Sequence, residues 1–230
     1  MSDVPDNRPI RAREHLAFSL LALLALAAMQ GGLRIGLLAY NSEQMDGTPL
    51  AAIGEAFING LRFDLRLATI GCLPLLLALV SRRAMSARAV MRGWLSLFAG
   101  VILLLGIVEL DFYREFNQRL NSLVFQYLKE DPRTVASMIW HGFPVLRHLF
   151  AWAIAAGLMV WLFRRIDRAT RGPMTRGLAG DDSQRGGWRR LALLVLCLPL
   201  AVLAIRGTLR QGPPLRWGDA FTTTSVFANQ

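Results

Sequence analysis

Residues 16–40 read LAFSLLALLALAAMQGGLRIGLLAY, an apolar run that contains a single charge, Arg34. A bilayer core of ~30 Å needs about 20 apolar residues to cross it as a helix, so this run is long enough to span. Four more apolar segments follow, at 51–80, 90–110, 145–163 and 191–205. A soluble domain rarely carries several such segments, so the chain is predicted to be an all-α integral membrane protein, a five-span helical bundle.

The net charge of +10 comes from 26 basic residues, all of them arginine except Lys129. In a soluble protein this surplus would favour nucleic acid as a partner. Here no basic face is interleaved with stacking aromatic side chains, so nucleic acid is not expected. The arginines are interpreted as topology signals and as contacts to the phospholipid bilayer and its anionic headgroups.

Cysteine and histidine do not indicate a metal or redox site. Cys72 and Cys197 both lie inside apolar segments, and the three histidines are scattered along the chain. A disulfide framework or a metal centre would need several such residues at characteristic spacings. We therefore expect no catalytic residue, no metal ligand and no cofactor in this chain.

The arginines are sorted by connection, which predicts the orientation. The tail 1–15 and the connections 81–92 and 164–190 are rich in arginine, whereas 41–50 has none. Positively charged loops stay in the cytoplasm, so the N-terminus is predicted inside and the C-terminus outside. An alternative for the first span is a cleaved signal peptide ending at small residues near Ala25, Ala27 and Ala28, which would leave four spans without inverting them.

The other segments complete the predicted domain organisation. The cytoplasmic tail covers 1–15 and the transmembrane domain 16–205. Within it, an interfacial amphipathic helix pair is predicted at about 112–140, between spans three and four, with Asp131 as an N-cap before Pro132. This pair is interpreted as an interfacial brace, with a moving gate as the alternative. Residues 206–230 show no periodicity and are expected to be an extracytoplasmic linker to a missing domain.

Several segments place polar groups at one predicted depth, near the outer leaflet. Asn59, Arg62 and Arg66 share one helical face, whereas Asp64 points away from it and is expected to pair with Arg34 or Arg206. An unpaired charge at this depth costs a few kcal/mol. The cluster is therefore interpreted either as a buried ion-pair network or as a site for an anionic lipid headgroup. Its members are Arg34, Asn59, Arg62, Asp64, Arg66, Glu109, Asp111 and Arg206.

A set of short motifs is distinctive in combination. They are Gly60-Leu61-Arg62-Phe63-Asp64, Glu109-Leu110-Asp111-Phe112-Tyr113-Arg114-Glu115-Phe116, Arg119-Leu120-Asn121, Tyr127-Leu128, Asp131-Pro132, Arg206-Gly207, Asp219-Ala220 and Ser225-Val226-Phe227-Ala228-Asn229. In their order and spacing they resemble the membrane half of the lipoteichoic acid synthase family, bacterial phosphoglycerol transferases of the alkaline phosphatase/sulfatase superfamily. The resemblance spans roughly residues 16–230.

The resemblance implies a multi-pass protein of the bacterial cytoplasmic membrane that takes part in cell-envelope biogenesis. In this family an extracellular sulfatase-like domain follows the fifth span, with a threonine nucleophile and a divalent metal, often manganese. That domain moves glycerol phosphate from a lipid donor through a covalent intermediate. Thr222, Thr223 and Thr224 do not match the nucleophile's motif, so no catalytic residue is carried over. The chain is expected to be the membrane anchor, with the metal and the transferase activity in the missing domain.

Two alternatives to the membrane anchor are an autonomous carrier and a non-catalytic membrane scaffold. An autonomous carrier would need polar residues at mid-membrane and repeated halves, whereas the charges here cluster at one edge. A non-catalytic membrane scaffold would differ from the anchor only by having no binding site.

Overall fold

The computed structural model of this chain describes residues 11–41, 49–116, 131–171 and 186–206. Within these ranges the protein is entirely helical, with seven α-helices and one short 3-10 helix. They are α1 (Ala12–Tyr40), α2 (Leu50–Leu77), η2 (Ala78–Val80), α3 (Arg82–Ser86), α4 (Arg88–Phe116), α6 (Pro132–Gly142), α7 (Val145–Arg171) and α8 (Gly186–Arg206).

Four helical stretches are long and apolar enough to cross a bilayer: Ala12–Tyr40, Ile53–Val80, Arg88–Arg114 and Val145–Arg171. They match the first four predicted spans and support a multi-pass membrane protein. The fifth predicted span, 191–205, is also helical, as part of α8. Its apolar stretch alone covers about 22 Å at 1.5 Å per residue, which is less than the ~30 Å of the bilayer core, so its crossing stays a prediction.

Helix α4 extends past residue 112, the approximate start predicted for a separate amphipathic helix. Helix α4 continues without a break to Phe116, because no glycine or proline after Gly106 ends it. Residues 117–130 of that predicted helix lie outside the described residues. The second predicted helix does form, as α6, and the Asp131 carboxylate caps it by accepting hydrogen bonds from Thr134 N at 3.2 Å and Thr134 Oγ1 at 3.0 Å.

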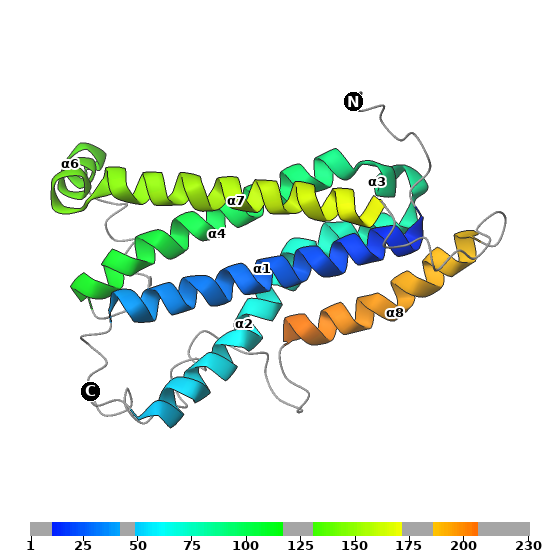
Figure 1. The fold of residues 1–230 in the computed structure, drawn as a ribbon, viewed down its shortest axis with the longest axis horizontal. Helices are drawn as coiled ribbons and strands as arrows, with labels where there is room; N and C mark the ends of the chain where they lie inside the picture. The colour runs from blue at the N-terminus through cyan, green and yellow to red at the C-terminus, as the bar shows by residue number, and fades with distance from the viewer. Residues whose placement is uncertain (1–10, 42–48, 117–130, 172–185, 207–230) are drawn as a thin grey trace.

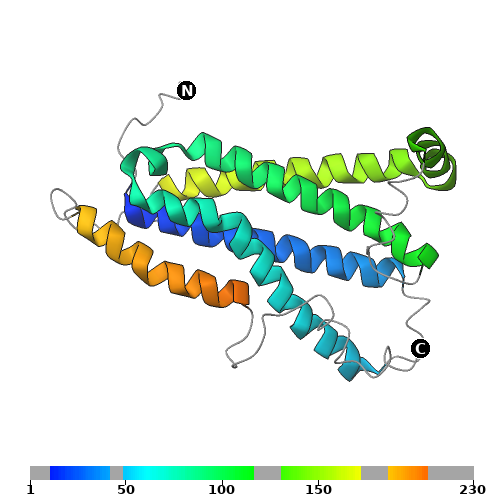
Figure 2. The same ribbon diagram turned by 180° about the vertical axis from the view of Figure 1, so that it is seen from behind.

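The helices form a bundle around α1 (Figure 1). Helix α1 packs against α2, α4 and α7, while α4 and α7 lie side by side and α8 rests on α2 and η2. The first half of α2 diverges from the other helices, and α6 runs across the start of α7 (Figures 1 and 2). We call the end where α1 begins and α7 ends the proximal end, and the opposite end the distal end.

The core between the helices is built from rows of apolar side chains at helical spacing. Helix α1 contributes Phe18, Ala22, Leu26 and Ala27, and the other helices supply the remaining members. These are Ala68, Cys72, Leu75, Ala78, Met91, Leu95, Ala99, Leu103, Met159, Phe163 and Ile166. Small residues bring the helix backbones close together, as is usual for membrane bundles. Gly71 is one of them: any Cβ there would collide with the Phe98 ring of α4.

Candidate functional site

At the distal end, Asp64 of α2 is paired with Arg34 of α1. Arg34 Nη2 donates to Asp64 Oδ1 at 2.8 Å, and the Asp64 side chain is only 9% exposed. Gln30, one turn before Arg34, donates from Nε2 to the Asp64 carbonyl at 3.2 Å. Arg34 is one of the two partners that the helical register predicted for Asp64, so the structure confirms this pair. It fixes the register of α1 against α2.

Gly60 makes room for this ion pair. It lies one turn before Asp64 on α2, and a Cβ added there would overlap the Arg34 guanidinium. Residue 60 must therefore be small if Arg34 is to lie flat against α2 and reach the carboxylate. Gly60 and Asp64 both belong to the Gly60-Leu61-Arg62-Phe63-Asp64 motif quoted above.

Asp111 forms the second polar group of the distal end, between α1, α4 and α7. Tyr40 Oη donates to Asp111 Oδ1 at 2.8 Å, and Arg147 Nη2 donates to Tyr40 Oη at 3.2 Å. His148 Nε2 lies 3.3 Å from Asp111 Oδ2, an ion pair when the imidazole is protonated. The guanidinium of Arg114 sits 5.6 Å from the centre of the Tyr40 ring. The sequence analysis selected Asp111 but did not select Tyr40, Arg147 or His148.

The remaining predicted residues are distributed over the distal part of the bundle. Arg62 is exposed on the diverging half of α2, and Arg206 is exposed at the end of α8. Asn59, Arg66 and Glu109 are half-buried. Because α2 is continuous through this stretch, Asn59, Arg62 and Arg66 do share one face, as predicted. The structure thus brings together Arg34 with Asp64, and places Asp111 in a group of its own.

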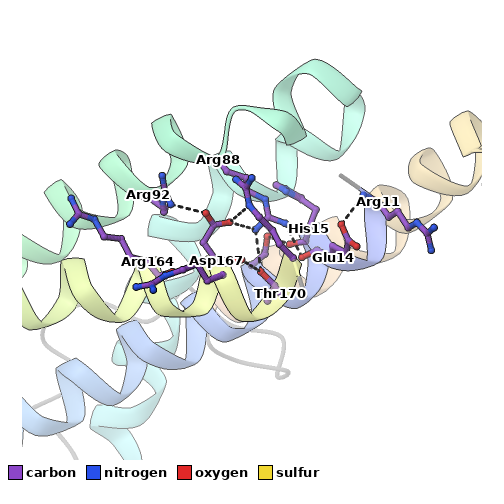
Figure 3. A network of polar contacts seen from close by, with 11 residues as sticks. Arg11, Glu14, His15, Arg88, Arg92, Arg164, Asp167 and Thr170 are labelled. Atoms are coloured by element: carbon purple, nitrogen blue, oxygen red, sulfur yellow. Dashed lines mark hydrogen bonds and ion pairs between the residues drawn. The ribbon is translucent and has the colours of Figure 1, made fainter. Parts of the chain in front are cut away.

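A third polar group, which the sequence did not reveal, is buried at the proximal end (Figure 3). The Asp167 carboxylate of α7 is 2% exposed and contacts three arginines. Arg88 Nη1 and Arg171 Nε approach Oδ1 at 3.2 and 3.0 Å, and Arg92 Nη1 approaches Oδ2 at 2.8 Å. Arg88 and Arg92 come from α4, so a single carboxylate joins two helices.

Arg88 also ties this group to α1. Its side chain is fully buried, donates from Nη2 to the Glu14 carbonyl at 2.9 Å, and lies with its guanidinium carbon 4.3 Å from the centre of the Phe18 ring. Nearby, His15 Nε2 is 2.7 Å from the Leu75 carbonyl, which links α1 to α2. A buried charge is tolerated when it is paired and hydrogen-bonded, and Arg88 meets both conditions.

This proximal group corrects the interpretation of two arginines. Arg88 and Arg92 were counted as basic residues of the 81–92 connection, yet they lie in α4 and bind Asp167. One signal could have pointed to the group. Asp167 is the only acid between residues 132 and 180, and four arginines lie within four positions of it.

Beside the proximal group, a groove of about 300 Å³ opens between α4 and α7. It is lined by Ala89, Arg92, Gly93 and Ser96 of α4 and by Val160 and Arg164 of α7. The α4 residues recur at helical spacing, so one face of the helix forms the wall. The groove therefore combines two guanidinium groups, a hydroxyl and a floor of small side chains.

Comparison with known proteins adds no relative: no family model, curated protein or solved structure matches this chain. Among the described residues, no three His, Cys, Asp or Glu side chains converge in a way that could hold a metal ion. What the arrangement offers is charge pairing at the two ends of the bundle and two guanidinium groups beside one groove.

Proposed function

We propose that this chain is the membrane module of a lipoteichoic-acid-synthase-like phosphoglycerol transferase. In this proposal it anchors an extracytoplasmic catalytic domain and presents lipid headgroups to it. The supporting observation is the position of the motifs that carry the resemblance. Asp64 and Asp111, from two separate motifs, both lie at the distal end, where each joins neighbouring helices through polar contacts. A module that serves chemistry at one membrane face is expected to hold paired polar groups at that face.

The proposed topology places the proximal end in the cytoplasm of a bacterial cell. The connections at the proximal end carry most of the arginines, and positive loops remain inside. Helix α8 is the fifth span in this proposal, with Trp188 and Arg206 near its two ends. The distal end then faces outward, and α6 lies along the outer interface, where its exposed Met138, Ile139 and Trp140 would contact lipid.

Within this topology, Arg34–Asp64 is a structural pair, and the exposed face of distal α2 is the surface for anionic headgroups. Arginine suits this task because its planar fork of donors matches a phosphate group. The divalent metal and the transfer step belong to the catalytic domain, and the residues of the module bind and orient. The alternative is a scaffold that binds no ligand. A measurement of lipid binding distinguishes this scaffold from the proposed module.

Cysteine labelling in intact cells tests the topology. In a background where Cys72 and Cys197 are replaced by alanine, single cysteines are placed at Ser86 and Thr223. A membrane-impermeant maleimide should label Thr223→Cys from outside and Ser86→Cys only after permeabilisation. The reverse pattern would leave no exported module to be anchored and would end the proposal.

The catalytic part of the proposal is tested on the gene. We expect the reading frame to continue past Gln230 into a domain with a threonine nucleophile and Asp/His metal ligands. A stop codon after Gln230, together with stable expression of the short protein, would favour the carrier or scaffold function instead.

A further inference from the structure

The groove between α4 and α7 has the chemistry of an anion site, although nothing in the proposed function uses it. Its lining residues Arg92 and Arg164 come from different helices and border the same space. Its volume of about 300 Å³ lies at the lower end of the range for small-molecule sites. We propose that this groove binds the phosphodiester of an anionic phospholipid in the leaflet at the proximal end.

The first argument is the surplus of arginine on the two segments that border the groove. The segments 82–92 and 164–171 hold eight arginines and a single acid, Asp167. That carboxylate is already shared by Arg88, Arg92 and Arg171. The Arg164 guanidinium makes no ion pair with any residue that the structure describes, and the Arg92 side chain is 31% exposed. Charges near a membrane surface need a counter-anion, and the leaflet supplies phosphate at high local concentration.

The second argument is the set of donors. Arg92 uses Nη1 for Asp167, which leaves its other N–H groups available toward the groove. Asp167 thereby holds Arg92 in place. The Ser96 hydroxyl lies one turn further along α4 and makes no hydrogen bond within the described part of the chain. Two guanidinium groups and one hydroxyl match the acceptor oxygens of a phosphodiester.

The third argument is access. Gly93 lies at the centre of the α4 wall, and a Cβ added there would meet no heavy atom within 4 Å. Ala89 on the preceding turn is also small, so the wall leaves space that larger side chains would occupy. Ala89, Gly93 and Arg164 are exposed, so the groove opens on the outer side of the helix pair, which would face the bilayer in the proposed topology. A lipid can therefore enter laterally, with its acyl chains remaining among the other lipids.

The experiment measures binding of phosphatidylglycerol to the purified full chain by native mass spectrometry, with phosphatidylcholine as the neutral probe. Two variants change the groove: Arg164→Gln removes a donor, and Gly93→Leu adds a side chain to the α4 wall at a position where the Cβ meets no heavy atom within 4 Å. Each has a matched control. Arg165→Gln removes an adjacent exposed charge outside the groove lining, and Gly36→Leu adds the same side chain to an open position on α1.

We expect the Kd for phosphatidylglycerol to rise about tenfold in Arg164→Gln and in Gly93→Leu, because a charged hydrogen bond or the space for the headgroup is lost. The two controls should bind like the parent, and none of the four variants should melt below it, since leucine in place of an open helical glycine raises helix propensity. Equal weakening in Arg164→Gln and Arg165→Gln would show diffuse attraction without a site. Unchanged binding in Gly93→Leu would also overturn the proposal. Equal binding of phosphatidylcholine, whose choline cation offsets the charge of the same phosphodiester, would overturn the assignment to an anionic lipid.

The assignment to a lipid has its own test. Glycerol 1-phosphate at the concentration of the phospholipid should not displace it, because it lacks acyl chains. Full displacement would identify a site for a soluble phosphate compound and overturn the lipid assignment. The inference about the groove does not depend on the transferase proposal. If the topology mapping contradicted that proposal, the groove variants and their controls would still show whether the groove binds lipid.

Discussion

At the residue scale, buried charges decide how this bundle is fixed in register. Arg88 and Asp167 are almost wholly excluded from solvent, and each would be costly to bury alone. Their mutual pairing does not make the protein more stable than an apolar pair would. It does mean that α1, α4 and α7 must come together in one register, because any slip would leave a charge without its partner.

Replacing Asp167 by asparagine should destabilise the bundle strongly. The shape of the side chain is kept, but Arg88 remains buried as an uncompensated cation, which costs about 3–5 kcal/mol when one partner of a buried pair is removed. Thermal unfolding in detergent would measure this as a lower melting temperature. Arg88→Met combined with Asp167→Asn should recover part of the loss, because no buried charge is then left alone. A double variant no better than Asp167→Asn would refute the argument.

Gly60→Ala tests the close approach at the distal end. Alanine in place of glycine gains up to about 1 kcal/mol of helix propensity. At Gly60 the new methyl group displaces the Arg34 guanidinium from Asp64, and a charged hydrogen bond contributes about 1.5–3 kcal/mol. The net result should be a loss of about 1 kcal/mol. Gly36→Ala is the control, since its Cβ meets nothing and the substitution should stabilise. Equal effects at both glycines would contradict this account of Gly60.

At the element scale, the helices were predictable and their mutual contacts only in part. The apolar runs located α1, α2, α4, α7 and α8, because a helix that crosses lipid must satisfy its own backbone hydrogen bonds within an apolar segment. The direction of Asp64 on α2 predicted a partner on another span, either Arg34 or Arg206, and the structure shows the pair with Arg34. The arginines next to Asp167 in the sequence include its partner Arg171, but its partners Arg88 and Arg92 lie on another helix. Local spacing does not give the position of that helix, so the group was missed.

Tryptophan side chains provide contacts between elements that no periodicity indicates. Trp152 Nε1 of α7 donates to the Gly100 carbonyl of α4 at 2.8 Å, and Trp94 Nε1 of α4 donates to the Gly71 carbonyl of α2 at 2.9 Å. Both acceptors are glycines, whose missing side chains leave the helix carbonyl accessible. Each bond links two neighbouring helices within the apolar part of the bundle.

Trp152→Phe should therefore weaken the α4–α7 contact. The ring volume is largely kept while the hydrogen bond to Gly100 is lost, and interhelical hydrogen bonds in membranes contribute about 0.6–1.7 kcal/mol. Trp161→Phe on the same helix is the control, because Trp161 is 54% exposed. Unfolding of both variants in one detergent would compare them. A Trp161 effect as large as that of Trp152 would point to a general role of tryptophan rather than to this bond.

At the scale of the whole molecule, the two ends of the bundle differ in kind. The proximal end is closed by a buried network that connects α1, α4 and α7, with further contact from α1 to α2. The distal end holds smaller groups, and α2 turns away from the bundle there (Figure 1). A proximal end tied together by a buried network and a more open distal end would suit the proposed module, which presents lipid headgroups to a catalytic domain at the distal face.

This asymmetry leads to a last prediction about lipid binding. Arg62 and Arg66 share a face of the diverging half of α2, so Arg62→Ala with Arg66→Ala should weaken retention of phosphatidylglycerol at the distal end about tenfold. Arg82→Ala with Arg83→Ala is the matched control, since it removes the same charge from exposed positions at the other end. Native mass spectrometry in the Gly93→Leu background, where the proximal groove is filled, isolates the distal contribution. Unchanged retention with a lowered melting temperature would make the distal arginines part of a structural ion-pair network, because the bundle would then need them and the lipid would not.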